Sequence, residues 1–363
     1  MDLLMDISVL LTEKKMDELE ELYAKKLAAE QEGVDPDLMA RFCKKEGVDG
    51  KLMAHFFEYF PGYFADRERW SQNNRDLVFE DITNILAMSY TNQGVPRYVY
   101  EGSSNSLQIY SVKVAGSRTQ WPLHVFGVVA IRDSIDQNRN LIFNRARDYC
   151  QIITEENPYL VLTGPTRAVG MNEPVTIEAE LKVKDAIESD DKYLIAQCKT
   201  VPLMLGLGMV ELTGPGERKL EIAVGGLETC VEATIFVKVI DGTWPVDFHG
   251  QLAARTANIH EKVILIEFSG EDVTVSGVDR SMEHLRHVVS VEASGELTVS
   301  LEAWKADEEV MTGEVIFKAE MSGRSFSYLK VGSCNLGVLV VWSRIRPMCE
   351  ELVPQSQMDL CNF

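Results

Sequence analysis

Strand-like segments fill the chain from residue 107 onward and leave few folds open to it. Eight segments rich in β-branched residues alternate apolar and polar positions, and Gly, Pro, Asn and Asp separate them. They begin at Leu107, His124, Val175, Ala233, Lys262, Leu297, Glu314 and Gly337. No amphipathic helix of useful length lies between them, which argues against a parallel βαβ sheet. We expect a two-sheet antiparallel β-sandwich or barrel-like domain over residues 107–345.

The first 92 residues have a different pattern and predict a small helical module, so the whole chain is mainly β and α+β overall. Helical spacing of apolar residues covers 12–32, a short stretch after Asp35-Pro36, a stretch ending at Pro61-Gly62, and about 75–90. Residues 93–106, with two glycines, a proline and three serines, predict a linker. The polar segment 346–363 predicts a loose tail.

An internal echo suggests that the β domain is duplicated. The segment Trp121–Arg132 aligns without gaps with Trp244–Arg255, and Trp, Pro, Gly, Ala and Arg match in place. A Val-Lys-Val strand precedes each segment. We therefore expect two half-repeats, about 107–183 and 234–304, that form a pseudo-symmetric sandwich. The alternative is that strand-turn-strand units resemble one another through composition.

Charge and hydropathy limit the partners. The 363 residues include 36 Lys and Arg against 56 Asp and Glu, a net charge of −20. Such a chain repels phosphate backbones unless a local patch overrides the total, so we expect no nucleic acid and a protein partner that is more basic. The longest apolar run, Val201–Val210, is shorter than the ~20 residues that a membrane span needs. A homo-oligomer is left open.

Cysteine usage and the N-terminus favour a cytoplasmic or nuclear protein. The seven cysteines are widely spaced and include no Cys-x-x-Cys pair, so we expect reduced thiols and neither a disulfide framework nor a zinc site. The first residues carry acids and no base, which fits neither a signal peptide nor a transit peptide. We expect no metal and no cofactor.

A loop dense in charge is the first candidate site. Guanidinium groups could form an anion-binding rim, and the aspartates could instead hold calcium. The plainer interpretation, which we favour, is a set of ion pairs that brace a long loop. The residues of this candidate anion-binding or ion-pair loop are Arg132, Asp133, Asp136, Arg139, Arg145, Arg147 and Asp148.

An apolar stripe in the helical module is the second candidate site. It has more large side chains than two short helices can bury between themselves, so they either dock on the β domain or bind another chain. The candidate partner-binding residues are Leu52, Met53, Phe56, Phe57 and Phe60.

We assign no catalytic residue. The chain has no Gly-x-Ser-x-Gly elbow, P-loop, Rossmann fingerprint or His-Glu-x-x-His motif. His284 and His287 lead into a strand pattern, where residues three apart face opposite ways, and no third ligand is evident. Glu283 and Arg286 have the spacing of a catalytic pair, but about 1.7 such pairs are expected by chance (35 × 18/363) in a chain with 35 Glu and 18 Arg. The sequence therefore leans away from an enzyme.

Several motifs in order resemble a plant domain-of-unknown-function family that is expanded in grasses. They are Trp121–Asp133, Asn138–Arg145, Arg147–Gln151, Pro158–Val169, Val231–Ile235, Arg286–Val291 and Gly332–Ser343. Some members of that family are fused to ribosome-inactivating N-glycosidase domains, which implies a defence, stress or toxin-related setting. The family has no established activity or catalytic residues to transfer. We therefore expect a non-enzymatic interaction or ligand-binding protein, with an rRNA N-glycosidase or its accessory domain, and a calcium-dependent membrane-binding module, as alternatives.

Overall fold

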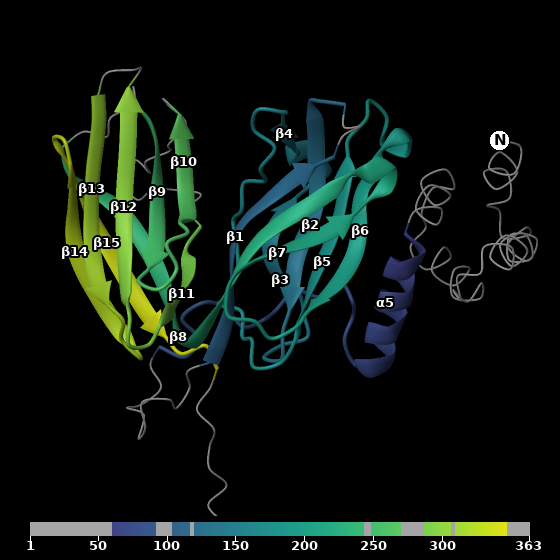
Figure 1. The fold of residues 1–363 in the computed structure, drawn as a ribbon, viewed down its shortest axis with the longest axis horizontal. Helices are drawn as coiled ribbons and strands as arrows, with labels where there is room; N and C mark the ends of the chain where they lie inside the picture. The colour runs from purple at the N-terminus through teal and green to yellow at the C-terminus, as the bar shows by residue number, and fades with distance from the viewer. Residues whose placement is uncertain are drawn as a thin grey trace, which may run out of the picture.

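The computed structural model describes residues 60–91, 104–116, 120–242, 248–269, 286–305 and 309–346 (Figure 1). Among these residues, one α-helix, α5 (Pro61–Asn73), precedes the strands. The strands of the first half are β1 (Ser104–Ala115), β2 (Leu123–Arg132), β3 (Asn140–Arg145), β4 (Gln151–Ile153), β5 (Val175–Val183), β6 (Lys192–Val201) and β7 (Gly206–Thr213). Those that follow are β8 (Lys219–Asp241), β9 (His249–Thr256), β10 (Val263–Ser269), β11 (Val288–Glu292), β12 (Glu296–Lys305), β13 (Glu309–Lys318), β14 (Gly323–Val331) and β15 (Cys334–Ser343).

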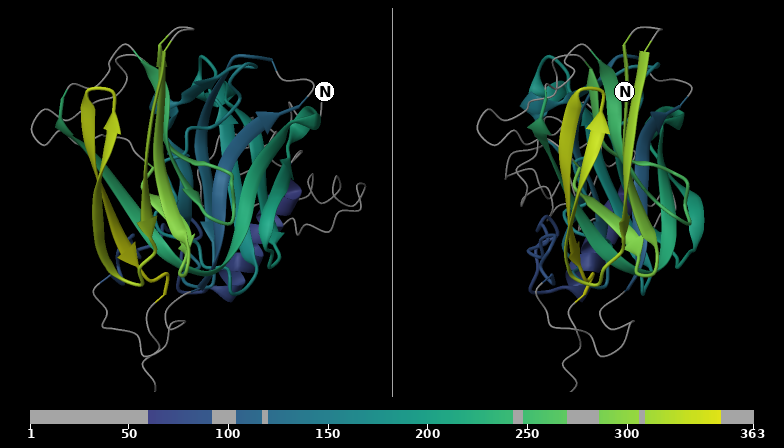
Figure 2. Two further views of the ribbon diagram at one scale, coloured as in Figure 1. Left: turned by 60° about the vertical axis from the view of Figure 1, so that its left-hand side comes forward. Right: turned by 90° about the vertical axis from the view of Figure 1, so that its left-hand side faces the viewer.

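The strands form two antiparallel β-sandwiches that share one long strand, β8 (Figures 1 and 2). The first part of β8, up to Cys230, pairs with β1, and it pairs with β7 over Lys219–Gly226. The second part pairs with β11 and β15. The facing sheets are β3-β2-β5-β6 in the first sandwich and β10-β9-β12-β13 in the second. The expected antiparallel sandwich class is confirmed.

Both sandwiches have the same strand order. In the first, β1, β8 and β7 face β3-β2-β5-β6; in the second, β8, β15 and β14 face β10-β9-β12-β13. In chain order, therefore, β14 occupies in the second sandwich the position that β7 occupies in the first. The echo at Trp121 and Trp244 precedes the equivalent strands β2 and β9. The half-repeats 107–183 and 234–304 stay a prediction, and the interval between them holds β6, β7 and the start of β8.

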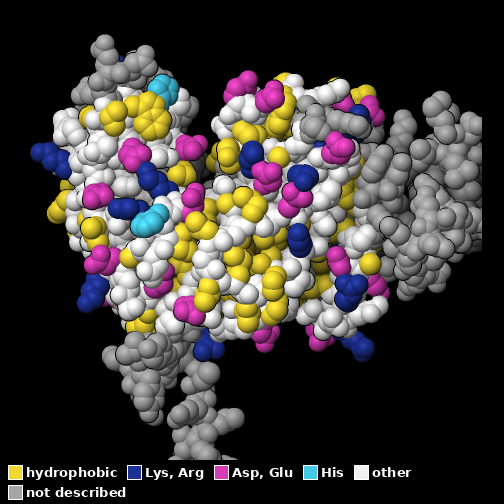
Figure 3. All heavy atoms as spheres, viewed as in Figure 1, with side chains coloured by type: hydrophobic (Ala, Val, Ile, Leu, Met, Phe, Trp, Pro, Cys, Tyr) yellow, Lys and Arg dark blue, Asp and Glu magenta, His cyan; other side chains and the backbone are white. Residues whose placement is uncertain are grey.

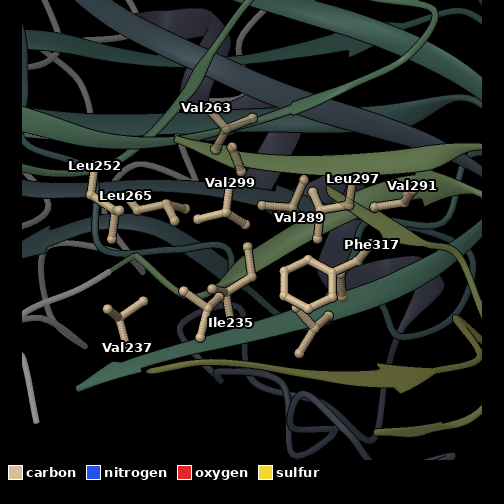
Figure 4. Close-up of a cluster of buried hydrophobic side chains, with 14 of the residues drawn as sticks. Ile235, Val237, Leu252, Val263, Leu265, Val289, Val291, Leu297, Val299 and Phe317 are labelled. Atoms are coloured by element: carbon tan, nitrogen blue, oxygen red, sulfur yellow. The ribbon is translucent and has the colours of Figure 1, made fainter. Parts of the chain in front are cut away.

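Each sandwich has its own hydrophobic core, built from the inward-facing residues at alternate positions of its strands. The first includes Ile109, Ile177 and Ile222, all almost fully buried. The second gathers β-branched and leucine side chains from both of its sheets, with Phe317 among them (Figure 4). Burial of each such side chain contributes roughly 1.5–3 kcal/mol, so these two cores supply most of the driving force for folding.

The helical predictions need correction where the structure describes them. No helix covers 75–90: that segment forms turns, and its backbone bonds other elements instead, with the Thr83 amide donating to Arg139 O and the Ala87 amide to Thr166 O. We expected Pro61 to end a helix, whereas it begins α5. Proline suits the first helical turn, where its missing N–H costs nothing. The predicted helices before residue 60 lie outside the described residues.

Candidate functional site

Two arginines of the charged loop converge on one buried carboxylate. Arg132 ends β2, Arg139 precedes β3, and both reach Glu178 on the neighbouring strand β5. Arg132 Nη2 donates to Glu178 Oε2 over 2.6 Å, and Arg139 Nε donates to Oε1 over 3.1 Å. The Glu178 side chain is fully buried. These two guanidinium groups already have an anionic partner within the chain.

Aromatic rings of helix α5 and of the segment that follows it cover this ion-pair cluster. The Tyr63 hydroxyl donates to Glu178 over 2.9 Å, and the Arg132 guanidinium lies 4.1 Å from the Phe79 ring centroid and 4.8 Å from that of Trp70. Burial alone would raise the pKa of Glu178, but hydrogen bonds from Arg139 and the charge of Arg132 hold it below its usual value. The cluster therefore stays ionised and attaches α5 to the first sandwich.

Asp133 forms a second buried pair, with a residue outside the predicted loop. It accepts bonds from Arg167 Nη1 over 2.7 Å and Nη2 over 2.9 Å, and from the Gly170 amide over 2.8 Å. Asp136 instead accepts from the Asn138 amide. A calcium-binding loop would need Asp133 and Asp136 to meet at its tip, and Asp133 is buried against Arg167. The described residues contain no group of three or more His, Cys, Asp or Glu placed to hold a metal ion.

The remaining loop residues do not join the buried cluster. Arg147 pairs with Asp191, its Nε donating to Oδ2 over 2.7 Å. The Asp148 carboxylate is 86% exposed and lies 4.0 Å from Lys184 Nζ. Arg145 is half-buried at the end of β3. The seven residues therefore divide among separate ion pairs and turns.

Of the predicted partner-binding stripe, Phe60 is the only member that the structure describes. Its side chain is 4% exposed and packs edge-to-face on Tyr193 of β6, with ring centroids 5.8 Å apart. Phe60 thus docks on the β domain. Leu52, Met53, Phe56 and Phe57 lie outside the described residues, so their role stays a prediction.

The motif residues at 283–287 have no shared site in the part of the chain that the structure describes. His287 and Arg286 are described, whereas Glu283 and His284 are outside the described residues. Arg286 is 1% exposed, and its Nη2 donates to Ile109 O over 2.6 Å. Burial lowers the pKa of Arg286 to about 10. His287 Nδ1 lies 2.8 Å from Ile235 O, and its ring packs on Phe236. Both contacts fit structural roles.

An exposed apolar strip on and before β7 is the feature that sequence reasoning missed. Four large side chains at alternating positions are each 56–62% exposed. We call this set, Leu203, Leu205, Leu207 and Met209, the β7 strip. Between them, Met204 packs on the first core, and Val210 after them is buried. Contiguous exposed apolar surface of this kind marks interaction sites more often than isolated residues do.

The backbone of β7 is open along the same stretch. The Thr213 amide donates to the Gln197 side chain and Glu211 O accepts from Lys199, so these odd-numbered residues direct their polar groups away from β8. Residues two apart in a strand direct their N–H and C=O groups to the same side. Leu207 and Met209 therefore present theirs at the free edge, and no hydrogen bond to these groups is found among the described residues.

Apolar groups border the strip on one side, and exposed acidic residues lie near them. Leu207 is opposite Gly225 in the β7–β8 register. A Cβ on Gly225 would lie 2.8 Å from the Tyr110 ring and 3.1 Å from Ile259, so these apolar groups border the strip on the side of the second sandwich. Hydrophobic side chains accordingly gather in Figure 3 over the part of the first sandwich where Figure 1 labels β7. Glu228 and Glu261 are exposed nearby, and neither forms an ion pair with a described residue.

One feature of the sequence indicates the β7 strip. Val201–Val210 is the longest apolar run of the chain, and Pro202, Gly206 and Gly208 interrupt it. Glycines within an apolar run are typical of loops, whereas Gly206 begins β7 and Gly208 lies within it. Alternation alone could not show that Leu207 and Met209 are solvent-exposed and lie at a free edge, because both properties depend on how the strands and sheets are arranged.

The fold and surface define a double β-sandwich protein with an exposed apolar edge strand. The chain belongs to DUF6598, a domain of unknown function, whose match spans residues 106–340. This agrees with the expected unknown-function family. No curated protein matches the chain.

Three solved structures with some likeness to the chain come from two proteins. The two C2 domains of extended synaptotagmin 2 match at 9% identity and a TM-score of 0.24, over 73% of this chain and 99% of that one. A longer piece of the same protein, with its SMP domain before the two C2 domains, matches at 8% identity and a TM-score of 0.23, over 69% of this chain and 60% of that one. Human GIVD cytosolic phospholipase A2 matches at 8% identity and a TM-score of 0.21, over 67% of this chain and 33% of that one. No helix among the described residues is long and apolar enough to cross a membrane.

Proposed function

We propose that the protein is a non-enzymatic binding module that takes an extended segment of another polypeptide along β7. The observation that carries this proposal is the coincidence of a free strand edge with the β7 strip, at Leu207 and Met209. An added strand would bond the free N–H and C=O groups, and its own apolar residues at alternate positions would contact the strip. Backbone bonds would give affinity and the side chains selectivity.

The partner segment carries basic residues beside its apolar ones. Glu211 and Glu221 are matched by Lys219 and Lys113, at 2.9 and 3.0 Å. Glu228 and Glu261, near the start of β7, have no such match among the described residues and would attract a basic side chain. The net charge of −20 acts in the same direction by accelerating encounter with basic partners.

We also place this function in the cytoplasm or nucleus. The four described cysteines, Cys150, Cys198, Cys230 and Cys334, are free thiols. Free thiols are typical of reducing compartments.

Selection of peptides on the immobilised full chain tests the proposal. The library would place apolar residues at alternate positions, and a Leu207→Lys/Met209→Lys variant would remove peptides that bind elsewhere. Val310→Lys, at a 70% exposed position of β13, is the matched control. We expect enriched peptides that bind wild type and the Val310 variant alike, and bind the double variant at least tenfold more weakly.

N-methylation of the enriched peptide then separates strand addition from simple apolar contact. Methyl groups on alternate amides should abolish binding in one register and leave it nearly unchanged in the other, because only every second amide of an added strand faces β7. Failure to enrich any peptide on wild type over the double variant would contradict the proposal. Equal loss in both registers would contradict the strand-addition geometry.

A further inference from the structure

The outer face of the sheet β14-β15-β8 carries a row of aromatic side chains. Phe326 is opposite Leu339, which is opposite Phe236. In the next row Tyr328 is opposite Gly337. The Phe326 and Tyr328 side chains are 49% and 63% exposed, and their rings meet edge-to-face at 5.0 Å. The right view of Figure 2 shows the yellow strands β14 and β15 that bear this row.

Gly337 has no side chain, so its neighbours approach its backbone closely in the middle of this face. A Cβ at this position would lie 2.9 Å from Ile240 Cδ1 and 3.1 Å from Phe326 Cε2. Ile240 and the Phe326 ring therefore lie close to Gly337, and the Phe326 and Tyr328 rings remain partly exposed to solvent. The Phe236 ring packs on the His287 ring, and the two ring centroids are 5.4 Å apart.

Three cations surround the rings. Arg324 and Lys330 precede and follow the two aromatic residues at every second position of β14, so their side chains leave the same face of the sheet. Lys238 of β8 is in the row of Tyr328 and Gly337. All three are exposed, and none pairs with a carboxylate of the described residues.

Two described carboxylates, beside the ends of β14 and β8, accept hydrogen bonds from neutral groups and keep their negative charge. Glu320 accepts a bond from the Ser325 hydroxyl over 2.8 Å, and Asp241 accepts from the Gly242 amide over 2.8 Å. The three cations therefore outnumber these two carboxylates, on a chain whose net charge is −20. A cluster of such cations against this background indicates an anionic ligand.

We propose that this face of the second sandwich binds single-stranded nucleic acid, with bases stacked on Phe326 and Tyr328 and phosphates held by Lys238, Arg324 and Lys330. Proteins that bind single-stranded nucleic acid commonly combine exposed aromatic side chains with cations on one sheet. Every base has a flat π-face that can stack on a ring, and every phosphodiester linkage carries a negative charge. An acidic peptide or an anionic membrane would use the cations but leave the rings without flat partners. This site is separate from the β7 strip and does not depend on peptide binding there. It reverses the expectation, drawn from net charge, that no nucleic acid binds.

Fluorescence anisotropy with the full chain tests this proposal. The probes are labelled twelve-nucleotide oligouridine and oligothymidine, whose comparison shows whether the ribose 2′-hydroxyl contributes. Three phosphate contacts predict a slope of about −2 for the logarithm of the binding constant against that of salt. Binding should therefore weaken about twentyfold between 50 and 200 mM salt.

Matched variants distinguish the face from general charge. Lys238→Gln/Lys330→Gln should lower affinity at least tenfold and flatten the salt slope, whereas Lys192→Gln, an exposed lysine of β6, should change neither. Tyr328→Ala should lower affinity at least about fivefold. Tyr149→Ala, at a position 76% exposed elsewhere, is its control. Circular dichroism verifies that each variant is folded.

Two results would overturn the proposal. The first is no change in anisotropy with either oligonucleotide at 50 mM salt. The second is displacement of the probe by polyglutamate or by phosphatidylserine vesicles as readily as by unlabelled oligonucleotide, with no effect of Tyr328→Ala, which would assign the face to an acidic peptide or a lipid surface instead.

Discussion

Glu178 connects helix α5 to the first sandwich through buried hydrogen bonds. It takes hydrogen bonds from Arg132, Arg139 and Tyr63, and no part of its side chain is exposed. Loss of one member of such a buried group leaves charges that nothing compensates, which costs more than the intact group contributes. The sequence predicted ion pairs in this loop but not their partner, since Glu178 lies 46 positions after Arg132 and looks like any polar residue of an alternating strand.

We expect Glu178→Gln to lower the free energy of unfolding by about 3–5 kcal/mol at pH 7, because two buried guanidinium groups lose their counter-charge. Glu221→Gln, which breaks a surface pair with Lys113, should cost less than about 1 kcal/mol. Urea unfolding of both variants measures the difference. Similar losses in the two variants would show that the cluster is not a special source of stability.

The same residue gives a pH dependence of known sign. Burial opposes ionisation of Glu178, but its arginine partners hold its pKa in the folded chain below the unfolded value of about 4.3. Its stabilisation is therefore complete above that pH and is lost as the pH falls through the lower folded pKa. Urea unfolding across this acidic range should show that the Glu178→Gln variant lacks this part of the acid-induced loss of stability.

At the scale of elements, β8 is the strand that joins the sandwiches, and Thr229 marks the change between them. Its φ of 51° is in the left-handed region, which a β-branched residue adopts only under strain. The pairing of β8 with β1 shifts register next to this residue, and the Thr229 amide donates to Asn105 Oδ1. The strain is thus held in place by neighbours where β8 passes from one core to the next.

We expect Thr229→Asn to raise the free energy of unfolding by about 1 kcal/mol, because asparagine tolerates the left-handed region. Thermal unfolding measures the change, with Thr312→Asn on β13 as a control in ordinary strand conformation. Equal destabilisation by both substitutions would contradict strain at residue 229.

At the scale of the whole molecule, the sequence predicted the fold class because alternation is a local property of each strand. Strands such as the one from Val175 were predicted within a residue or two. The division into two sandwiches was not predicted. Strand β8 continues for 23 residues through both cores, and its first half was assigned from the sequence to the interval between the repeats. Both proposed surfaces were missed for a related reason: edge positions and outward faces follow from sheet order, which no local pattern encodes.

Residue-resolved amide hydrogen exchange on the full chain tests the free edge of β7 most directly. We predict fast exchange at Leu207 and Met209 and slow exchange at Gly208 and Val210, which face β8. Addition of a peptide selected on the β7 strip should then slow exchange at Leu207 and Met209 above all. Slow exchange of these two amides in the free chain, or peptide-induced protection confined to other strands, would contradict the proposal that β7 is open to a partner.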